Sequence, residues 1–370
     1  MILKNNLKKK KFKNSLLNIL DKNDLNKNKL NEKRDDEDKF DENKIVENED
    51  LKNNNKEQNK NVKLKIFGLV NHNNYCFMNS SLQIFFHLER FVEKIVNIKL
   101  NNNNQLLSIE IQNILKITEN NSIADPIKIK NIINSIQPEY KNDDQEDAFE
   151  LITIFLEQLK QELKNIDNNY KPNININDNE ELNAWNKFKK RHIDKYNSFI
   201  WELFYGIIKK EIICEKKHRI LINYIPFNII ELPQFNENIT LINLIEYFQK
   251  ENEVFAKYEC NKCGEIDKYF IKKTIITLPK YLLIYSDKNK IKTINEIKYK
   301  DIIKEESKNN DIYQLKGLIG YNGNSYSGHY YSRCKIYNDW YYFSDSYFEK
   351  IETPNISQND MILVFELKTN

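Results

Sequence analysis

Residues 71–83 read NHNNYCFMNSSLQ, and the interpretation of the whole chain starts from this stretch. A polar turn leads into an apolar run with helical spacing, so Cys76 is predicted to lie at the start of a helix. Unpaired backbone N–H groups and the positive end of the helix dipole favour a thiolate at such a position. Asn71 lies on the turn and could donate a side-chain hydrogen bond to an oxyanion beside the sulfur. The alternative is that Cys76 acts as a small hydrophobic residue in a first helical turn.

A cysteine nucleophile needs a histidine as its base, and the chain has five histidines. His87 lies in an apolar helical run and His192 in a charged stretch, so structural or surface roles explain them better. His329 follows a loop that contains Gly and Ser and stands at the start of a predicted strand. The loop leaves room for a substrate and the strand would hold the imidazole. His329 is therefore the predicted base, and only a tertiary fold can bring it to Cys76.

The group that orients His329 depends on the register of two predicted strands, GHYYSR and WYYFSDS. A tight two-residue turn would place Ser344 opposite Arg333, whereas a six-residue loop would place Ser344 opposite His329. In the second register Ser344 faces the imidazole and Asp345 points away unless the strand bulges. Asp345 is nevertheless the stronger electrostatic partner for an imidazolium. Both residues are retained, with Ser344 in the triad position and Asp345 in support.

Composition limits the class of protein. The 370 residues include 57 Lys+Arg and 54 Asp+Glu, a formal charge of +3, which argues against a dedicated nucleic-acid surface. No apolar run approaches the roughly 20 residues that span a bilayer, and no secretion signal is expected. Five cysteines, an odd number, suit a reducing compartment. We expect a cytoplasmic or nuclear protein that is a monomer and has no nucleic-acid partner.

The chain divides by composition into a polar tail and a folded part. Residues 1–61 are nearly all Asn, Lys, Asp and Glu, which predicts disorder, and order is expected to begin at a strand-like entry, 62–70. Helical spacing of apolar residues predicts helices within 76–96, 105–117 and 145–163, and the polar stretch 164–182 predicts a surface loop. After about Trp201 the pattern turns to strands. A helical first half with a strand-rich second half indicates an α+β fold.

These motifs together resemble the ubiquitin-specific proteases, cysteine deubiquitinases of papain-like ancestry. GLVNHNNYCFMNSSLQ is similar to the family's cysteine box, and YNGNSYSGHYYSRCKIYNDWYYFSDSYFEKI is similar to its histidine box. QEDAFELITIFL, SFIWELFYGIIKKEIIC and ITLPKYLLIYS match further family segments in order, so the resemblance runs from about residue 66 to 366. It implies a papain-like catalytic domain over 62–370, with a helical thumb (about 66–165) and a β-sheet palm and β fingers (about 200–370).

By position, the resemblance implies that Cys76 is the nucleophile, His329 the general base and Asn71 the oxyanion donor. Asp147 and Glu150 fall where the family holds the basic C-terminal tail of ubiquitin, which opposite charge would favour. An acidic first turn of a helix explains the same two residues equally well. The implied activity is thiol-dependent hydrolysis of the isopeptide bond after the C-terminal glycine of ubiquitin, with ubiquitin and ubiquitinated proteins as partners.

The chain departs from the family's boxes at several positions. Asn73 stands where the family prefers Gly, and Asn tolerates a positive φ better than other side chains. Tyr75 replaces Thr and Phe77 replaces Tyr, from which we expect crowding. Ser344 replaces the more common Asn or Asp. These departures favour a second interpretation, a catalytically weak module that binds ubiquitin, and a third is a protease for a ubiquitin-like modifier.

The resemblance also raises the question of a structural zinc ion, although the chemistry itself requires no cofactor. The family's fingers often hold zinc with two C-x-x-C pairs, and YECNKCG supplies Cys260 and Cys263. The partner stretch CEKKH supplies Cys214, has Lys217 where a second Cys belongs, and offers His218 one residue later. A Cys-x-x-x-His variant would complete four ligands. The alternative is a site that has been lost, with strands held by packing alone.

Overall fold

The structure is a computed structural model that describes residues 62–100, 104–141, 144–166, 169–235, 238–286, 289–291, 294–303, 311–324 and 327–368. The tail predicted for residues 1–61 lies outside the described residues. Nearly all of the described residues belong to one compact unit, Lys60–Asn322 with His329–Asn370. Among the described helices, none combines the length and apolar character needed to traverse a bilayer.

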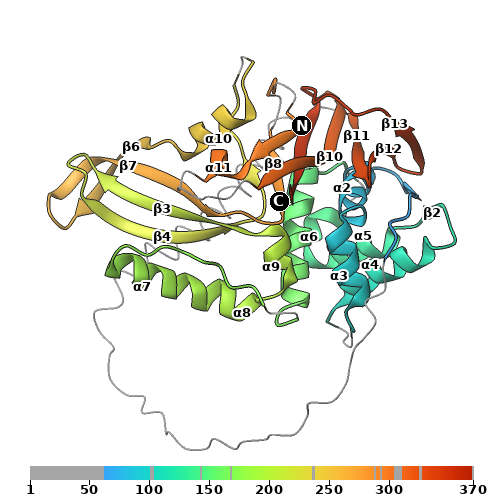
Figure 1. Ribbon diagram of the computed structural model, residues 1–370, viewed down its shortest axis with the longest axis horizontal. Coiled ribbons are helices and arrows are strands. Elements are labelled where there is room, and N and C mark those ends of the chain that lie inside the picture. Colours follow the sequence, from blue (N-terminus) through green and yellow to red (C-terminus); the bar gives the residue numbers. More distant parts are fainter. Residues whose placement is uncertain are drawn as a thin grey trace, which may run out of the picture. The chain divides into compact units, whose positions relative to one another are not determined.

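Helices form most of the first half of the described chain (Figure 1). They are α2 (Cys76–Phe86), α3 (Glu89–Asn97), α4 (Leu106–Ile117), α5 (Ile127–Ile136), the 3₁₀ turn Pro138–Lys141, α6 (Ala148–Glu162), α7 (Asn179–Phe188), a π-helical turn Lys189–Ile193, α8 (Asp194–Tyr196) and α9 (Phe199–Phe204), with α10 (Leu241–Gln249) and α11 (Tyr299–Ile302) later. The helical segments expected from apolar spacing are present. Helices α5 and α10 were not predicted, and α7 begins inside the stretch interpreted as a loop.

The helix predicted over 76–96 is in fact two helices. The N–H groups of His87 and Leu88 bond to carbonyls three residues earlier, at 3.1 and 3.2 Å, and this tightening ends α2. Every residue of α2 is buried, as expected for a helix that is apolar on most of its circumference. Helix α2 packs against α6 on one side and strand β12 on another, which places it in the centre of the fold.

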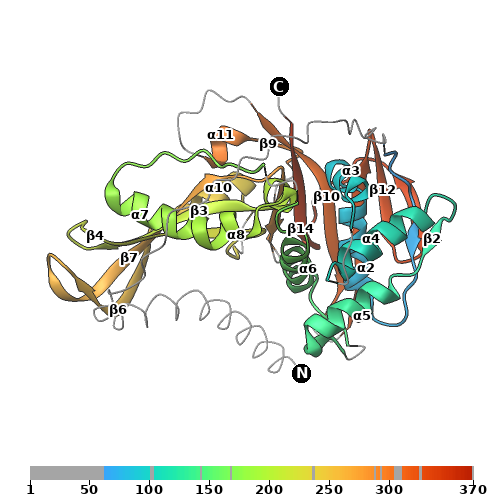
Figure 2. The ribbon, with the colours of Figure 1, turned by 90° about the horizontal axis from the view of Figure 1, so that it is seen from below.

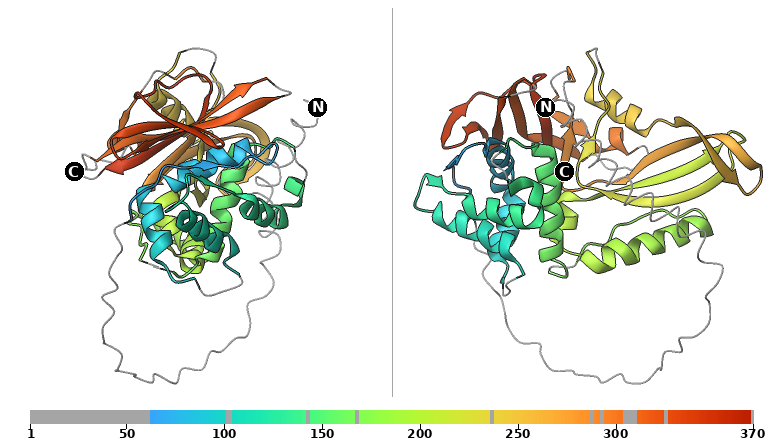
Figure 3. Two further views of the ribbon diagram at one scale, coloured as in Figure 1. Left: turned by 90° about the vertical axis from the view of Figure 1, so that its right-hand side faces the viewer. Right: turned by 180° about the vertical axis from the view of Figure 1, so that it is seen from behind.

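A mixed sheet covers the helical group, as Figures 1 and 3 show. Its strand order is β13-β12-β11-β10-β14-β8-β5, with β9 also paired to β10, and all pairs are antiparallel except β5 with β8. The strands are β5 (Ile230–Glu231), β8 (Tyr281–Tyr285), β9 (Glu296–Lys298), β10 (Ile312–Gly323), β11 (Gly328–Ile336), β12 (Asp339–Ser344), β13 (Tyr347–Ile351) and β14 (Asp360–Lys368). Helices packed on a largely antiparallel sheet confirm the α+β class.

A second sheet extends away from the helices and is called the finger sheet here (Figure 2). Its order is β4-β3-β7-β6, all antiparallel. The strands are β3 (Gly206–Cys214), β4 (Arg219–Phe227), β6 (Asn252–Cys260) and β7 (Gly264–Thr277). The β3–β4 and β6–β7 connections both lie at the far end of this sheet, so residues that flank the two turns are brought together.

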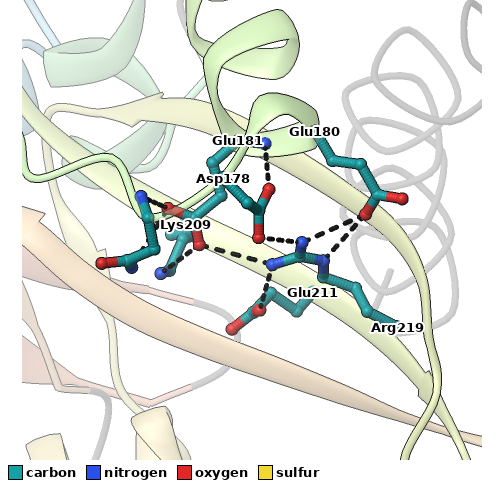
Figure 4. Close-up of polar contacts among 7 residues, drawn as sticks. Asp178, Glu180, Glu181, Lys209, Glu211 and Arg219 are labelled. Carbon is teal, nitrogen blue, oxygen red and sulfur yellow. Dashed lines mark hydrogen bonds and ion pairs between the residues drawn. The ribbon is translucent and has the colours of Figure 1, made fainter.

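Arg219 fixes α7 to the finger sheet (Figure 4). Its guanidinium donates to Asp178, the residue that caps α7, and to Glu180 at 3.1 Å. Glu181 is only 2% exposed and is paired with Lys209 of β3 at 3.2 Å. A buried carboxylate requires such partners, so the charges hold the start of α7 at one place on the sheet.

A short parallel pair, β1 (Gly68–Leu69) with β2 (Ile123–Ala124), is all the regular structure in the predicted entry strand. The Leu69 N–H donates to the Asp345 carbonyl at 2.8 Å, so this segment lies against the turn between β12 and β13. The approach at Gly68 is so close that an added Cβ would lie 2.3 Å from the Ser346 carbonyl oxygen. Only glycine fits there.

We therefore expect Gly68→Ala to displace the β12–β13 turn and to lower the free energy of unfolding by about 1–3 kcal/mol, as overpacking does. The measurement is thermal unfolding, with Gly264→Ala as the comparison. Gly264 has a φ of 80° but no atom within 4 Å of an added Cβ, so its cost comes from backbone strain alone and leaves the turn in place. A Gly68→Ala protein as stable and as active as wild type would contradict the close approach.

Candidate active site

Cys76 is the first residue of α2 and is 2% exposed. Burial raises the pKa of its thiol, a hydrogen bond from the Tyr330 backbone lowers it in part, and the negative charge of Asp345 raises it again. The predicted position at a helix start is therefore correct, but the expected preference for a thiolate is outweighed in the free protein, because desolvation penalises the charged form. An acceptor for the thiol proton is needed close by.

His329 is the second residue of β11, directly before Tyr330. Because the Tyr330 backbone bonds to the Cys76 sulfur, strand β11 brings His329 to the start of α2. The Nε2 atom of His329 lies 2.8 Å from the Ser344 hydroxyl oxygen and 3.8 Å from an Asp345 carboxylate oxygen. With Nε2 engaged in this way, Nδ1 is the ring nitrogen that remains for the thiol.

The β11–β12 register differs from both predicted alternatives. Lys335 pairs with Trp340, and the hairpin turns at two residues, Tyr337 and Asn338, the first with a φ of 55°. Ser344 is therefore opposite neither Arg333 nor His329. Extending the register by one residue puts it opposite the residue two positions beyond His329, on the same face of the sheet. The 2.8 Å contact with the imidazole is a diagonal one, which neighbouring antiparallel strands allow.

Asp345 does not point away from the site, contrary to the expectation for the second register. It occupies the two-residue turn between β12 and β13 with a φ of 53°, a left-handed conformation that Asp tolerates. Its carboxylate accepts hydrogen bonds from the side-chain amides of Asn71 and Asn79, each at 2.8 Å. Asp345 thus connects the turn before Cys76, helix α2 and the imidazole of His329.

The turn before Cys76 is held by its own asparagines. The Asn71 carbonyl oxygen accepts from the Tyr75 backbone N–H at 3.0 Å while its amide nitrogen bonds to Asp345, and a second N–H of that amide remains for an oxyanion. Asn73 has a φ of 104°, which confirms that Asn can replace Gly in this turn. The turn that the substitution put in question is present.

Tyr75, the unusual residue before the cysteine, is buried beside a buried lysine. The Lys130 ammonium lies 5.4 Å from the centre of the Tyr75 ring and 3.1 Å from the Asn134 side-chain oxygen. Lys130 is only 2% exposed, and an attraction between cation and ring stabilises a charge in such a place. The expected crowding at Tyr75 is accommodated by this contact.

The acidic residues predicted to hold a substrate tail lie at the start of α6. Asp147 is the N-cap, its carboxylate accepting from the Phe149 backbone N–H at 2.9 Å, and Glu150 lies in the first turn. The alternative interpretation of an acidic first turn therefore describes their local structure. It does not exclude a contact with substrate, because each carboxylate can accept further hydrogen bonds.

Other polar residues were missed or assigned only to the background. Asn79 and Gln145 both contact the site, Gln145 with its amide nitrogen 3.7 Å from the Cys76 sulfur. Both lie inside the motifs that carried the resemblance, and that was the available signal. His87 and His192 are enclosed, burial lowers the pKa of each to about 4, and neither is near the nucleophile.

A separate group of four possible metal ligands lies at the far end of the finger sheet. The ligand atoms of Cys214, His218, Cys260 and Cys263 all lie within 4.8 Å of one another. The sulfurs of Cys214 and Cys263 are 3.8 Å apart, and His218 Nδ1 is 3.2 Å from one Cys263 sulfur and 3.9 Å from Cys260. The four residues flank the β3–β4 and β6–β7 turns.

The geometry of this group fits zinc. Tetrahedral zinc with Zn–S bonds of about 2.3 Å and Zn–N bonds of about 2.0–2.1 Å separates its ligand atoms by about 3.5–3.8 Å. Three thiolates and one imidazole are a common donor set for a closed structural site. Lys217, which stands where a second Cys was expected, has a φ of 63°, and this left-handed residue turns the chain so that His218 faces the cysteines. The residues could therefore hold a zinc ion that joins the two turns.

Removing Ser344 or Asp345 should have different consequences. Ser344→Ala loses one hydrogen bond to the imidazole, worth about 1.5–3 kcal/mol if the ring is charged, so kcat of a cysteine-dependent reaction should fall about 10- to 100-fold. Asp345→Ala also leaves the Asn71 and Asn79 amides without their partner, and we expect a larger loss together with a lower thermal midpoint. Equal stability of Asp345→Ala and wild type would show that Asp345 does not organise the site.

For the metal group we expect one zinc per chain by elemental analysis of protein purified without chelator. His218→Ala should lose most of that zinc and unfold at a lower temperature, because binding energy at a structural site is folding energy. His72→Ala, which removes an exposed histidine outside the group, should keep the zinc. Unchanged zinc content in His218→Ala would place the ion elsewhere.

The sequence was compared with known families and proteins. It matches the family described as "Ubiquitin carboxyl-terminal hydrolase" over residues 67–365. Ubiquitin carboxyl-terminal hydrolase 2 of Rattus norvegicus is 22% identical over 328 residues, covering 80% of this chain and 53% of the relative. Ubiquitin carboxyl-terminal hydrolase Usp2 of Drosophila melanogaster is 26% identical over 336 residues, covering 81% and 34%. The chain thus spans about half, or less, of the length of these relatives.

Solved structures share the fold. The SAGA Ubp8/Sgf11/Sus1/Sgf73 DUB module bound to ubiquitin aldehyde matches with a TM-score of 0.65 at 18% identity, over 84% of this chain and 71% of that chain. The same module bound to monoubiquitin matches with a TM-score of 0.64 at 18% identity, over 82% and 70%. These likenesses confirm the predicted papain-like α+β architecture. Because the family match covers most of the sequence, including Cys76 and His329, the chain belongs to the ubiquitin carboxyl-terminal hydrolase family.

Proposed function

We propose that this chain is a thiol-dependent deubiquitinase that hydrolyses the isopeptide bond after the C-terminal glycine of ubiquitin on protein conjugates. One observation carries the proposal: β11 bonds to the Cys76 sulfur at Tyr330 and holds His329 in the preceding position, with Ser344 on the far side of the imidazole. Family membership and neighbours solved with ubiquitin bound support the same conclusion.

The proposed reaction begins with transfer of the Cys76 proton to His329. The sulfur then attacks the carbonyl carbon of the terminal glycine, a C–S bond forms, and the carbonyl π electrons move to the oxygen. That oxyanion would be stabilised by the Cys76 backbone N–H and by the second N–H of the Asn71 amide. His329 donates its proton to the departing lysine amine as the C–N bond breaks. Water, with His329 again as base, hydrolyses the thioester and restores the thiol.

The raised thiol pKa gives His329 a specific task in this scheme. A thiol that is mostly protonated at neutral pH requires a base whenever substrate arrives. Ser344 and Asp345 would stabilise the resulting imidazolium by a hydrogen bond and by charge, at 2.8 and 3.8 Å from Nε2. Formation of the ion pair is then favoured when substrate covers the site, since water no longer screens the charges.

The recognition of ubiquitin is assigned in outline. Asp147 and Glu150, at the start of α6, would pair with the basic C-terminal tail, and the finger sheet would hold the folded part of ubiquitin. In this scheme residues 62–370 form the catalytic domain, with a helical thumb (about 66–165) and fingers and palm (about 200–370). We further propose a monomer in the cytoplasm or nucleus that acts on ubiquitinated proteins.

Two other functions remain as competitors. A catalytically weak module that binds ubiquitin was suggested by Asn73, Tyr75 and Ser344. The turn at Asn73, the cation beside Tyr75 and the bond from Ser344 to His329 favour the enzyme over this module. A protease for a ubiquitin-like modifier would use the same residues and the same chemistry, so only the choice of probe distinguishes it.

The test is covalent capture by a ubiquitin whose C-terminus carries a vinyl electrophile. We expect the full chain to form a one-to-one adduct, visible as a mass shift. Cys76→Ala should form none, and His329→Ala should react at least about 100-fold more slowly, because general-base catalysis typically contributes that much. Ubiquitin binding without an adduct on wild type would leave the binding module, and reaction only with probes built on ubiquitin-like modifiers would favour the third function.

A further inference from the structure

Gln145 lies in the segment that leads into α6 and reaches the nucleophile directly. Its amide nitrogen is 3.7 Å from the Cys76 sulfur, within the range of an N–H···S hydrogen bond. Among the described residues it is the only side chain that hydrogen-bonds to this sulfur; the other donors are backbone N–H groups. The contact joins two segments far apart in the sequence at the atom where the reaction would start.

The oxyanion donor assigned from the sequence is partly engaged already. Asn71 uses its carbonyl oxygen for the Tyr75 N–H and one amide hydrogen for Asp345, so it has a single N–H left. One side-chain donor of that kind is a modest provision for the charge that develops in acyl transfer. Gln145 supplies a second side-chain donor at the sulfur.

We propose that Gln145 is a catalytic residue whose amide N–H donates first to the Cys76 thiolate and then to the carbonyl oxygen of the tetrahedral intermediate. The proposal rests on the proposed function and names a further donor of the same site. No proton is transferred by Gln145. The sulfur electron pair forms the C–S bond, the carbonyl π pair moves to the oxygen, and the N–H follows the negative charge.

Distance and acceptor strength both support this role. The carbonyl oxygen is attached to the carbon that bonds to sulfur, so a donor held against the sulfur needs only a small rotation to reach the oxygen. A neutral thiol is a weak acceptor and a thiolate a strong one, so the contact strengthens when Cys76 ionises. The bond from Gln145 also lowers the pKa of the thiol, against the larger effect of burial. A residue that merely anchored the loop would bond to backbone carbonyls instead.

The first measurement is the pH dependence of Cys76 alkylation by iodoacetamide in the full chain, followed by mass spectrometry of the peptide that contains Cys76. Removing an N–H donor to the thiolate raises its pKa, so the alkylation midpoint of Gln145→Ala should move to higher pH than that of wild type. Gln145→Glu should move it further in the same direction, because a carboxylate repels a thiolate. Gln137→Ala is the matched control, a glutamine just before the same helix whose side chain does not reach the sulfur, and its midpoint should equal that of wild type.

The second measurement is turnover of a fluorogenic ubiquitin C-terminal amide. Loss of one oxyanion donor typically lowers kcat by about 10²- to 10³-fold, so we expect a fall of about 100-fold in Gln145→Ala with KM within about threefold of wild type. A thermal midpoint close to that of wild type would show that the variant is folded.

An unchanged alkylation midpoint in both Gln145 variants would overturn the proposal whatever the turnover, because the contact would then be absent in solution. A kcat within about threefold of wild type would overturn it as well. Alkylation needs no ubiquitin. If wild type fails to turn over the ubiquitin probe, the proposed function falls, and the midpoint shift still decides whether Gln145 bonds to the thiolate.

Discussion

The carboxylate of Asp345 is the point on which the active site depends. It binds the amides of Asn71 and Asn79 and lies 3.8 Å from the His329 imidazole, while its own backbone carbonyl receives the Leu69 N–H. These contacts join the turn before the nucleophile, the nucleophile helix and the strand that holds the base. A charged acceptor with two amide donors is stronger than a neutral one, which suits a junction between segments that are distant in sequence.

The same carboxylate has an electrostatic cost. Its negative charge adds to burial in raising the pKa of the Cys76 thiol, so the residue that aligns the site also disfavours the nucleophilic form. Donors placed around the sulfur oppose this effect, namely the backbone of Tyr330, the backbone of Phe77 and the amide of Gln145. The balance produces a cysteine that is mostly a thiol at rest and is ionised by its histidine when the charge can be used.

The finger sheet is stabilised at two places by different chemistry. At its far end, Cys214, His218, Cys260 and Cys263 form a group suited to zinc, which would hold two turns with little hydrophobic core between them. Beside that group, Arg219 fixes the start of α7 through carboxylates on the helix (Figure 4). Adjacent residues of one strand thus take part in both, so loss of the metal would be expected to loosen the helix as well.

The sequence by itself determined the class of fold, the helix start at Cys76, the tolerance of Asn73 for a positive φ and the four ligands of the metal group. These follow from local properties, namely apolar spacing, backbone preference and the spacing of donors in short motifs. Only the tertiary structure decided the strand register at His329, the position of Asp345 and the approach of Gln145 to the sulfur. The reason is physical: a two-residue turn at Tyr337 and a left-handed residue at 345 redirect side chains by an amount that alternation along a strand does not encode.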